Sequence, residues 1–146
     1  MSKGKNILII CTGNTCRSPM AEGLLKKALP FCNVSSAGIF ALSGTGANAN
    51  AIAVAKEKGI DISAHVARQI TQQLITDSDL ILCMTKGHTE MLKNEKATTL
   101  GEYAGTNEEV VDPFGDDIEG YRRCFTQLEG LTEKIADIIS NDNKTS

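Results

Sequence analysis

The stretch that organises this chain is ILIICTGNTCRSP, residues 7–19. The apolar run 7–10 has the composition of a buried β-strand, and it ends directly on Cys11. A polar loop with one glycine follows. Ser18 and Pro19 then predict a helix start, with Ser18 as the N-cap and Pro19 at the first helical position. The sequence therefore predicts a strand, a short loop and a helix in direct succession.

The loop after this strand combines a thiol with features that bind anions. The N-terminus of a helix exposes unpaired N–H groups at the positive end of the helix dipole, so it attracts anions and stabilises a thiolate at Cys11. Gly13 and Asn14 tolerate positive φ, which lets loop amides turn inward. Arg17 offers a planar fork for two phosphoryl oxygens. We therefore expect a phosphate-type site beside a nucleophilic thiol. The competing interpretation is a buried cysteine in a turn, with Arg17 on the surface.

The remaining sequence alternates short apolar strands with helical patterns, which is typical of an α/β fold with a parallel sheet. The predicted strands are 5–10, 33–37, 80–84 and 98–100. The predicted helices are 19–29, 47–58, 87–94 and a last one marked by apolar residues from Tyr121 to Ile138 at three- or four-residue steps. In such a sheet, ligands bind beyond the carboxyl ends of the strands, which is where Cys11 is expected.

Length and composition favour a single globular domain over residues 1–146, with a frayed tail at 141–146. The formal net charge is only −3, so nucleic acid is not an expected partner. No apolar run approaches the length of a membrane span and no signal-peptide pattern is present, so no membrane partner is expected. Five cysteines without a CxxC pair favour reduced thiols and a cytoplasmic location. His65 and His88 are far apart, and we expect no metal site.

Asp112 is the best candidate for a second catalytic group. A thiolate that attacks a phosphoryl group needs an acid to protonate the leaving atom, and then a base to activate water. Asp112 precedes Pro113, whose ring fixes φ, and Gly115 follows at a turn position. The carboxyl of Asp112 is therefore expected on a loop of defined conformation. Phe114 is placed to line the edge of the pocket. The alternative is a plain Asp-Pro turn before the last helix.

Five motifs together resemble one known family. They are CTGNTCRSP at 11–19, SAG at 36–38, HVARQ at 65–69, LCM at 82–84 and DPF at 112–114. In order and spacing the chain is similar to the low-molecular-weight protein tyrosine phosphatase family. The resemblance implies a single-domain, flavodoxin-like, three-layer α/β fold with a four-stranded parallel sheet. It also implies a cysteine-dependent phosphoprotein phosphatase that uses no metal or cofactor and acts on a phosphorylated protein substrate.

The resemblance also implies a role for each matching residue. Cys11 resembles the nucleophile that forms a phosphocysteine intermediate, Arg17 the phosphate clamp, and Asp112 the general acid and then base. Ser18 resembles the donor of a hydrogen bond to the Cys11 thiolate. The implied phosphate-binding loop consists of Thr12, Gly13, Asn14, Thr15, Cys16, Arg17 and Ser18. The implied supports of that loop are Asn14, Ser18, Ser36 and His65.

Thr15 bears on which phosphorylated residue is the substrate. Tyrosine-directed members usually carry an aliphatic residue there, whereas this loop resembles the branch of protein arginine phosphatases. Thr85 stands where many tyrosine-directed members have an acid, which favours the same branch. Phe40 and Phe114 are candidate specificity residues, whose rings would lie on either side of a flat group of the substrate. The alternative is that both rings serve ordinary packing. The segment 65–69 looks instead like tyrosine-directed sequences. Phosphoarginine is therefore the favoured substrate and phosphotyrosine the alternative.

Other classes of protein fit the sequence less well. An arsenate reductase of this fold would need two further relay cysteines. Cys83 is better explained as a buried strand residue, and the next cysteine, Cys124, lies on the last helix. No GxxxxGK[ST] motif is present, which disfavours a nucleotide-binding module. A catalytically inactive phosphoprotein-binding domain is the non-enzyme alternative, and the presence of Cys11, Arg17 and Asp112 disfavours it.

Cys16 lies in the same loop as Cys11, and this proximity suggests redox chemistry. We hypothesise that peroxide forms a Cys11–Cys16 disulfide, which would protect Cys11 from overoxidation. The alternative is that Cys16 only fills space in the loop.

For the oligomeric state of the protein, we expect a monomer or a weak dimer.

Overall fold

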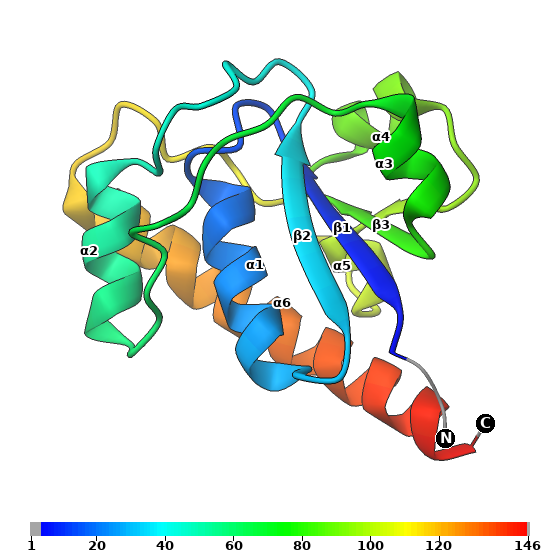
Figure 1. Ribbon diagram of the computed structural model, residues 1–146. Helices are drawn as coiled ribbons and strands as arrows, with labels where there is room; N and C mark the ends of the chain where they lie inside the picture. Colours follow the sequence, from blue (N-terminus) through cyan, green and yellow to red (C-terminus); the bar gives the residue numbers. More distant parts are fainter. Residues whose placement is uncertain (1–3, 146) are drawn as a thin grey trace.

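The computed structural model describes residues 4–145, and these residues form one parallel sheet covered by helices (Figure 1). The strands of the sheet are β1 (Asn6–Cys11), β2 (Asn33–Gly38), β3 (Leu80–Cys83) and β4 (Ala97–Thr99). They lie in the order β2-β1-β3-β4, and every neighbouring pair is parallel. The predicted α/β fold with a four-stranded parallel sheet is therefore confirmed.

Helices cover both faces of this sheet, so the fold has three layers (Figure 1). The helices are α1 (Arg17–Ala28), α2 (Ala49–Glu57), α3 (Gln72–Asp77), α4 (Lys86–Leu92), α5 (Leu100–Tyr103) and α6 (Ile118–Thr145). The alternating side chains of β1 explain the layers, because successive residues of a strand point to opposite faces. Ile7 and Ile9 join the core under α1, α2 and α6, whereas Leu8 and Ile10 join the smaller core under α3 and α4.

The start of α1 differs from the prediction. The helix begins at Arg17, so its N-cap residue is Cys16, and no side chain caps it. The expectation of Ser18 as N-cap is therefore wrong. The reason is that the Ser18 hydroxyl is used elsewhere, in contact with the Cys11 sulfur. The expectation of Pro19 at the first helical position is also wrong, because it is the third residue of α1. It lies within the first turn, where its missing N–H leaves no helix bond unmade.

Two short helices were not foreseen from the sequence, and both are held by side-chain caps. The Thr71 hydroxyl accepts a hydrogen bond from the backbone N of Leu74 and starts α3. Thr99 and Glu102 form a reciprocal capping box around α5, directly after β4. Helices of six and four residues are too short to show the apolar periodicity on which the prediction relied.

At the carboxyl end of the chain, α6 continues through Thr145, across the segment for which fraying is expected. Fraying concerns motion, which this structure does not test, so the frayed tail stays a prediction. The assignment of residues 1–146 to a single domain also stays a prediction. Among the described residues, no helix is both long and apolar enough to cross a membrane.

The sheet brings the ends of β1, β2 and β3 together at one edge. Cys11 pairs with Gly38, and Ile10 pairs with Cys83. The segment after β2 crosses close over the loop 12–16, because the backbone N of Phe40 donates to the carbonyl O of Thr12 at 2.9 Å. A Cβ atom at Gly38 would lie only 2.5 Å from that same carbonyl oxygen. Close packing of two backbones therefore requires glycine at position 38.

We predict that Gly38→Ala lowers the free energy of unfolding by about 1–3 kcal/mol, the usual cost of forcing an extra carbon into a packed site. Gly46→Ala is the matched control, since a Cβ there meets no atom within 4 Å. Urea unfolding of both variants and the wild type gives the comparison. Equal destabilisation by the two substitutions would contradict the steric argument.

Candidate active site

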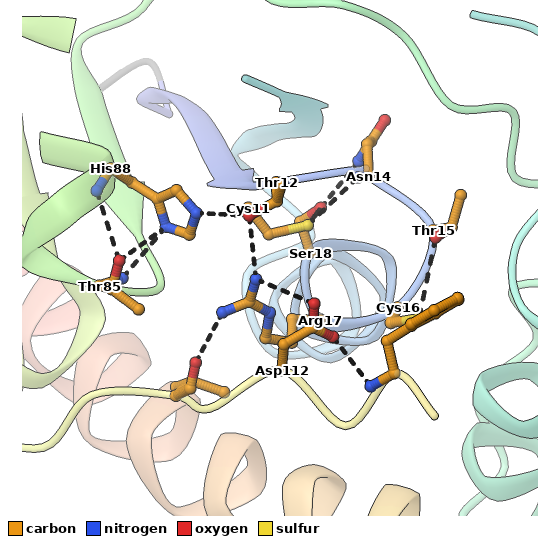
Figure 2. A network of polar contacts seen from close by, with 12 residues as sticks. Cys11, Thr12, Asn14, Thr15, Cys16, Arg17, Ser18, Thr85, His88 and Asp112 are labelled. Carbon is orange, nitrogen blue, oxygen red and sulfur yellow. Dashed lines mark hydrogen bonds and ion pairs between the residues drawn. The ribbon is translucent and has the colours of Figure 1, made fainter. Parts of the chain in front are cut away.

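The sulfur of Cys11 lies at the end of β1 and contacts two groups of the following segment (Figure 2). The backbone N of Asn14 donates to Cys11 Sγ at 3.3 Å, and Ser18 Oγ lies 2.9 Å from the same atom. The Cys11 side chain is buried, with 2% exposure. Two donors directed at one sulfur stabilise a thiolate more than a thiol, because only the thiolate carries a full negative charge.

Asn14 has a φ of 58° in the left-handed region, and its side chain is completely buried. Its Nδ2 donates to Ser18 Oγ at 2.8 Å and to Ser36 Oγ at 2.9 Å, while its Oδ1 accepts from the backbone N of Arg68 at 3.0 Å. Because Asn14 already donates to the Ser18 oxygen, the Ser18 proton is free to point at Cys11. Gly13 lies outside the left-handed region, so the expectation of positive φ there is wrong.

His65 and Ser36 lie behind Asn14 and hold it from two sides. His65 Nε2 donates to the carbonyl O of Asn14 at 2.8 Å. The Ser36 hydroxyl donates to Glu22 Oε1, and the same carboxylate lies 3.9 Å from His65 Nδ1. Glu22 was not foreseen, because an acid within a helical pattern carries no sign of a partner on a distant strand.

Arg17 has a buried side chain that joins the loop to the segment of Asp112. Its Nη1 donates to the carbonyl O of Val110 at 2.8 Å, and its Nη2 donates to Thr12 Oγ1 at 3.3 Å. Asp112 Oδ2 lies 3.7 Å from the same Nη2. The Asp112 side chain is 47% exposed, so the carboxyl lies at the mouth of the site and the guanidinium lies inside it. The structure thus brings Cys11, Arg17 and Asp112 into one site.

The segment of Asp112 is anchored to the end of β3 by its backbone. The backbone N of Val110 donates to the carbonyl O of Met84 at 3.0 Å, and Glu109 Oε2 accepts from the backbone N of Lys86 at 2.6 Å. Asp112 Oδ1 in turn accepts from the backbone N of Phe114 at 3.0 Å, which orients the carboxyl. The carboxyl of Asp112 is therefore held by the same framework that holds the thiol.

The candidate specificity residues differ in their exposure. Thr15 is half-buried, and its hydroxyl lies 3.7 Å from Cys16 Sγ. Phe40 and Phe114 are 69% and 75% exposed, so the interpretation of these rings as ordinary core packing is wrong. Their part in binding a substrate stays a prediction.

The other cysteines near the site differ from Cys11 in their surroundings. Cys16 is buried, its sulfur lies 3.7 Å from the hydroxyl of Tyr121, and burial raises the pKa of its thiol. Burial also raises the pKa of Cys83 to about 12 and that of Cys124 to about 12. Cys83 is completely buried at the end of β3 and Cys124 is buried on α6, so both are core residues rather than exposed relay thiols.

Comparison with known proteins places this site in a family. The family model for low molecular weight phosphotyrosine protein phosphatases matches residues 6–145. A protein-arginine-phosphatase of Geobacillus stearothermophilus is 42% identical over 144 residues, covering 93% of this chain and 97% of the relative. EpsP of Ralstonia solanacearum, a probable low molecular weight protein-tyrosine-phosphatase, is 55% identical over 129 residues, covering 86% and 89%.

A solved structure shows the same fold over nearly the whole chain. It is a cysteine-to-serine mutant of YwlE arginine phosphatase with a phosphorylated active-site serine. It superposes with a TM-score of 0.91 at 36% identity, covering 97% of this chain and 99% of that one. The sequence match, the fold and the coverage agree with one another. This chain belongs to the low molecular weight phosphotyrosine protein phosphatase family and is accordingly a phosphatase.

Proposed function

We propose that this protein hydrolyses phosphoarginine in proteins through a phosphocysteine intermediate. The observation that carries the proposal is the joint position of Cys11, Arg17 and Asp112, with threonine at position 15 of the loop between them. A relative named as a protein-arginine-phosphatase, similar over 97% of its own length, supports the choice of substrate. No residue of this scheme requires a metal or a cofactor.

In the first step, the Cys11 thiolate attacks phosphorus, so that an S–P bond forms and the P–N bond of phosphoarginine breaks. The leaving nitrogen takes its proton from the carboxyl of Asp112, which lies at the mouth where the leaving group departs. The Arg17 fork and the loop amides hold the three equatorial oxygens, on which negative charge is spread in the transition state. The arginine product carries a positive charge that the Asp112 carboxylate can pair.

In the second step, water attacks the phosphocysteine. Asp112, now a carboxylate, takes a proton from this water, and the S–P bond breaks to give inorganic phosphate and the Cys11 thiolate. Ser18 stabilises the departing sulfur, because its hydroxyl proton points to it. In this proposal the Thr15 hydroxyl orients the attacking water, a role that an aliphatic residue cannot take.

Phosphotyrosine is the second candidate substrate, and a specific observation favours it. EpsP, at 55% identity, is named as a probable tyrosine phosphatase. The two substrates differ in the group that follows phosphorus: a phenol is flat and apolar, whereas a guanidinium is flat and charged. A threonine at position 15 offers a smaller and more polar surface than the aliphatic residues of tyrosine-directed members.

The cytoplasmic location of the protein and its assembly as a monomer or weak dimer stay predictions.

We predict that Asp112→Asn lowers kcat on phosphoarginine peptides by about 10²–10⁴-fold, the usual contribution of a general acid. The loss should be much smaller on p-nitrophenyl phosphate, whose leaving group needs little protonation. Asp116→Asn, in the same segment, is the matched control. Cys11→Ser should abolish turnover of both substrates. Equal losses on both substrates for Asp112→Asn would contradict the assignment of Asp112 as general acid.

We predict that Thr15→Ile lowers the ratio of kcat/KM for phosphoarginine over phosphotyrosine peptides by about tenfold or more, within the range of pocket discrimination. Thr15→Val removes the hydroxyl at nearly constant volume, so it separates polarity from size. The two ratios are measured on peptides of one sequence with either phosphorylated residue. An unchanged ratio in Thr15→Ile would show that position 15 does not select the substrate.

We predict that Cys16→Ala recovers less activity than the wild type when dithiothreitol follows peroxide, because Cys11 would then oxidise to irreversible acids. Cys32→Ala is the control, since Cys32 is half-buried and lies outside the loop. Recovery and the mass of the peptide that contains Cys11 are measured together. Full recovery in Cys16→Ala would exclude a protective Cys11–Cys16 disulfide.

A further inference from the structure

His88 is a buried histidine that reaches the active-site loop from another part of the chain (Figure 2). It lies in the first turn of α4, directly after β3, and its side chain is 6% exposed. Its Nε2 lies 3.0 Å from Thr12 Oγ1, and its Nδ1 lies 3.3 Å from the backbone N of Thr85 and 3.1 Å from the Thr85 hydroxyl. The ring therefore bridges the start of α4 and the loop.

The partners of this ring determine where its proton lies. A backbone N–H can only donate, so Nδ1 accepts from Thr85 and carries no proton. The proton is then on Nε2, which donates to Thr12 Oγ1. Burial lowers the pKa of His88, and Arg17 lowers it further, while Glu109 and Asp112 act in the opposite direction. A neutral ring with its proton on Nε2 follows.

This tautomer fixes the direction of the Thr12 hydroxyl. A hydroxyl oxygen has two lone pairs and one proton. In this structure His88 Nε2 and Arg17 Nη2 both donate to Thr12 Oγ1, at 3.0 and 3.3 Å. With both lone pairs occupied, the Thr12 proton must point to a third partner. Thr12 is exposed at the mouth, and its hydroxyl shares an Arg17 nitrogen with Asp112, so an anion held by Arg17 lies within its reach.

We propose that His88 is a positioning residue that turns the Thr12 hydroxyl into an oriented hydrogen-bond donor for the phosphoryl group and holds Arg17 in place. The proposal rests on the proposed phosphatase site but not on the identity of the phosphorylated residue. His88 does not touch the substrate and acts through Thr12. Thr85 sets the tautomer, because its backbone N and hydroxyl both direct a proton at Nδ1.

A purely structural role for His88 would explain only half of these contacts. Thr85 and His88 form a capping box at the start of α4, which accounts for Nδ1. The capping box makes no use of Nε2, whose bond to Thr12 crosses from α4 to the loop after β1. The two roles therefore predict different results for substitutions that spare the helix but remove the bond to Thr12.

The first test compares His88→Ala, His88→Gln and Thr12→Val, with Thr89→Ala on the same helix as control. We expect kcat/KM on p-nitrophenyl phosphate to fall about tenfold in His88→Ala and in Thr12→Val, a typical loss for a hydrogen bond to a charged group. His88→Gln should recover most of this loss, because its amide can donate to Thr12. The double variant His88→Ala with Thr12→Val should lose no more than either single one.

Two results would overturn the proposal in this test. Additive losses in the double variant would show that His88 and Thr12 act independently. Full activity in His88→Ala, matching Thr89→Ala, would show that the ring serves only the helix. The inhibition constant of inorganic phosphate is measured for each variant as a second readout, and it should rise in His88→Ala and Thr12→Val. If no phosphorylated substrate is turned over, the proposed function fails, while binding of phosphate still tests His88.

The second test uses pH. The folded pKa of His88 lies below its ordinary value of 6.5, so the ring becomes charged only as the pH falls further. A proton on Nδ1 would then face the N–H of Thr85, and the ring charge would repel Arg17. The groups that face the ring are Arg17, Glu109 and Asp112. The ratio of wild-type to His88→Gln kcat/KM should be constant above about pH 7 and fall on acidification.

Taking this ratio cancels the ionisations that both proteins share. A ratio that stays flat down to the pH at which the protein unfolds would overturn the proposal. The tautomer itself is read from the ¹⁵N resonances of the imidazole ring. We expect a neutral ring protonated on Nε2 at pH 7. A ring protonated on Nδ1 at that pH would also overturn the proposal.

Discussion

The buried amide of Asn14 is the interaction on which the active-site loop depends. Its left-handed backbone costs about 1–2 kcal/mol for a residue with a Cβ atom. Three side-chain hydrogen bonds, to Ser18, Ser36 and the backbone of Arg68, each contribute about 1 kcal/mol and offset this cost. The backbone N–H of Asn14 consequently points at Cys11. The conformation that directs an amide at the sulfur is therefore held by side-chain bonds and not by the loop alone.

The same amide determines the direction of two hydroxyl protons. Asn14 Nδ2 donates to both Ser18 and Ser36, so neither hydroxyl can donate back to it. The Ser36 proton turns to the carboxylate of Glu22, and the Ser18 proton turns to Cys11. The Thr12 hydroxyl is oriented in the same way, because two donors occupy its oxygen. Donors that are already oriented lower the reorganisation that the reaction requires.

The sequence predicted the strand, loop and helix around Cys11, and the structure places Arg17 and Asp112 in the same site as this cysteine. What the sequence could not show is which partner a polar group chooses. Ser18 was expected as an N-cap, whose oxygen accepts a backbone N–H. In the structure it lies inside α1, its oxygen accepts from Asn14 Nδ2, and its proton is left for the sulfur. Arg17 is held by the backbone carbonyl of Val110, and a backbone contact of this kind cannot be predicted from the type of residue at position 110. His88 had a findable signal, a Thr-x-x-His cap directly after a strand.

A buried hydrogen-bond network lies beside exposed side chains in this site. Asn14, Ser18 and Arg17 are buried and tied by hydrogen bonds, so a change at any of them disturbs the chemistry of every substrate. Phe40 and Phe114 are exposed, and their side chains are free to change without loss of that network. Relatives named for arginine and for tyrosine are therefore both compatible with one catalytic framework. Overall identity measures the shared framework, so under the proposed function the choice of phosphorylated residue falls to a few exposed residues outside it.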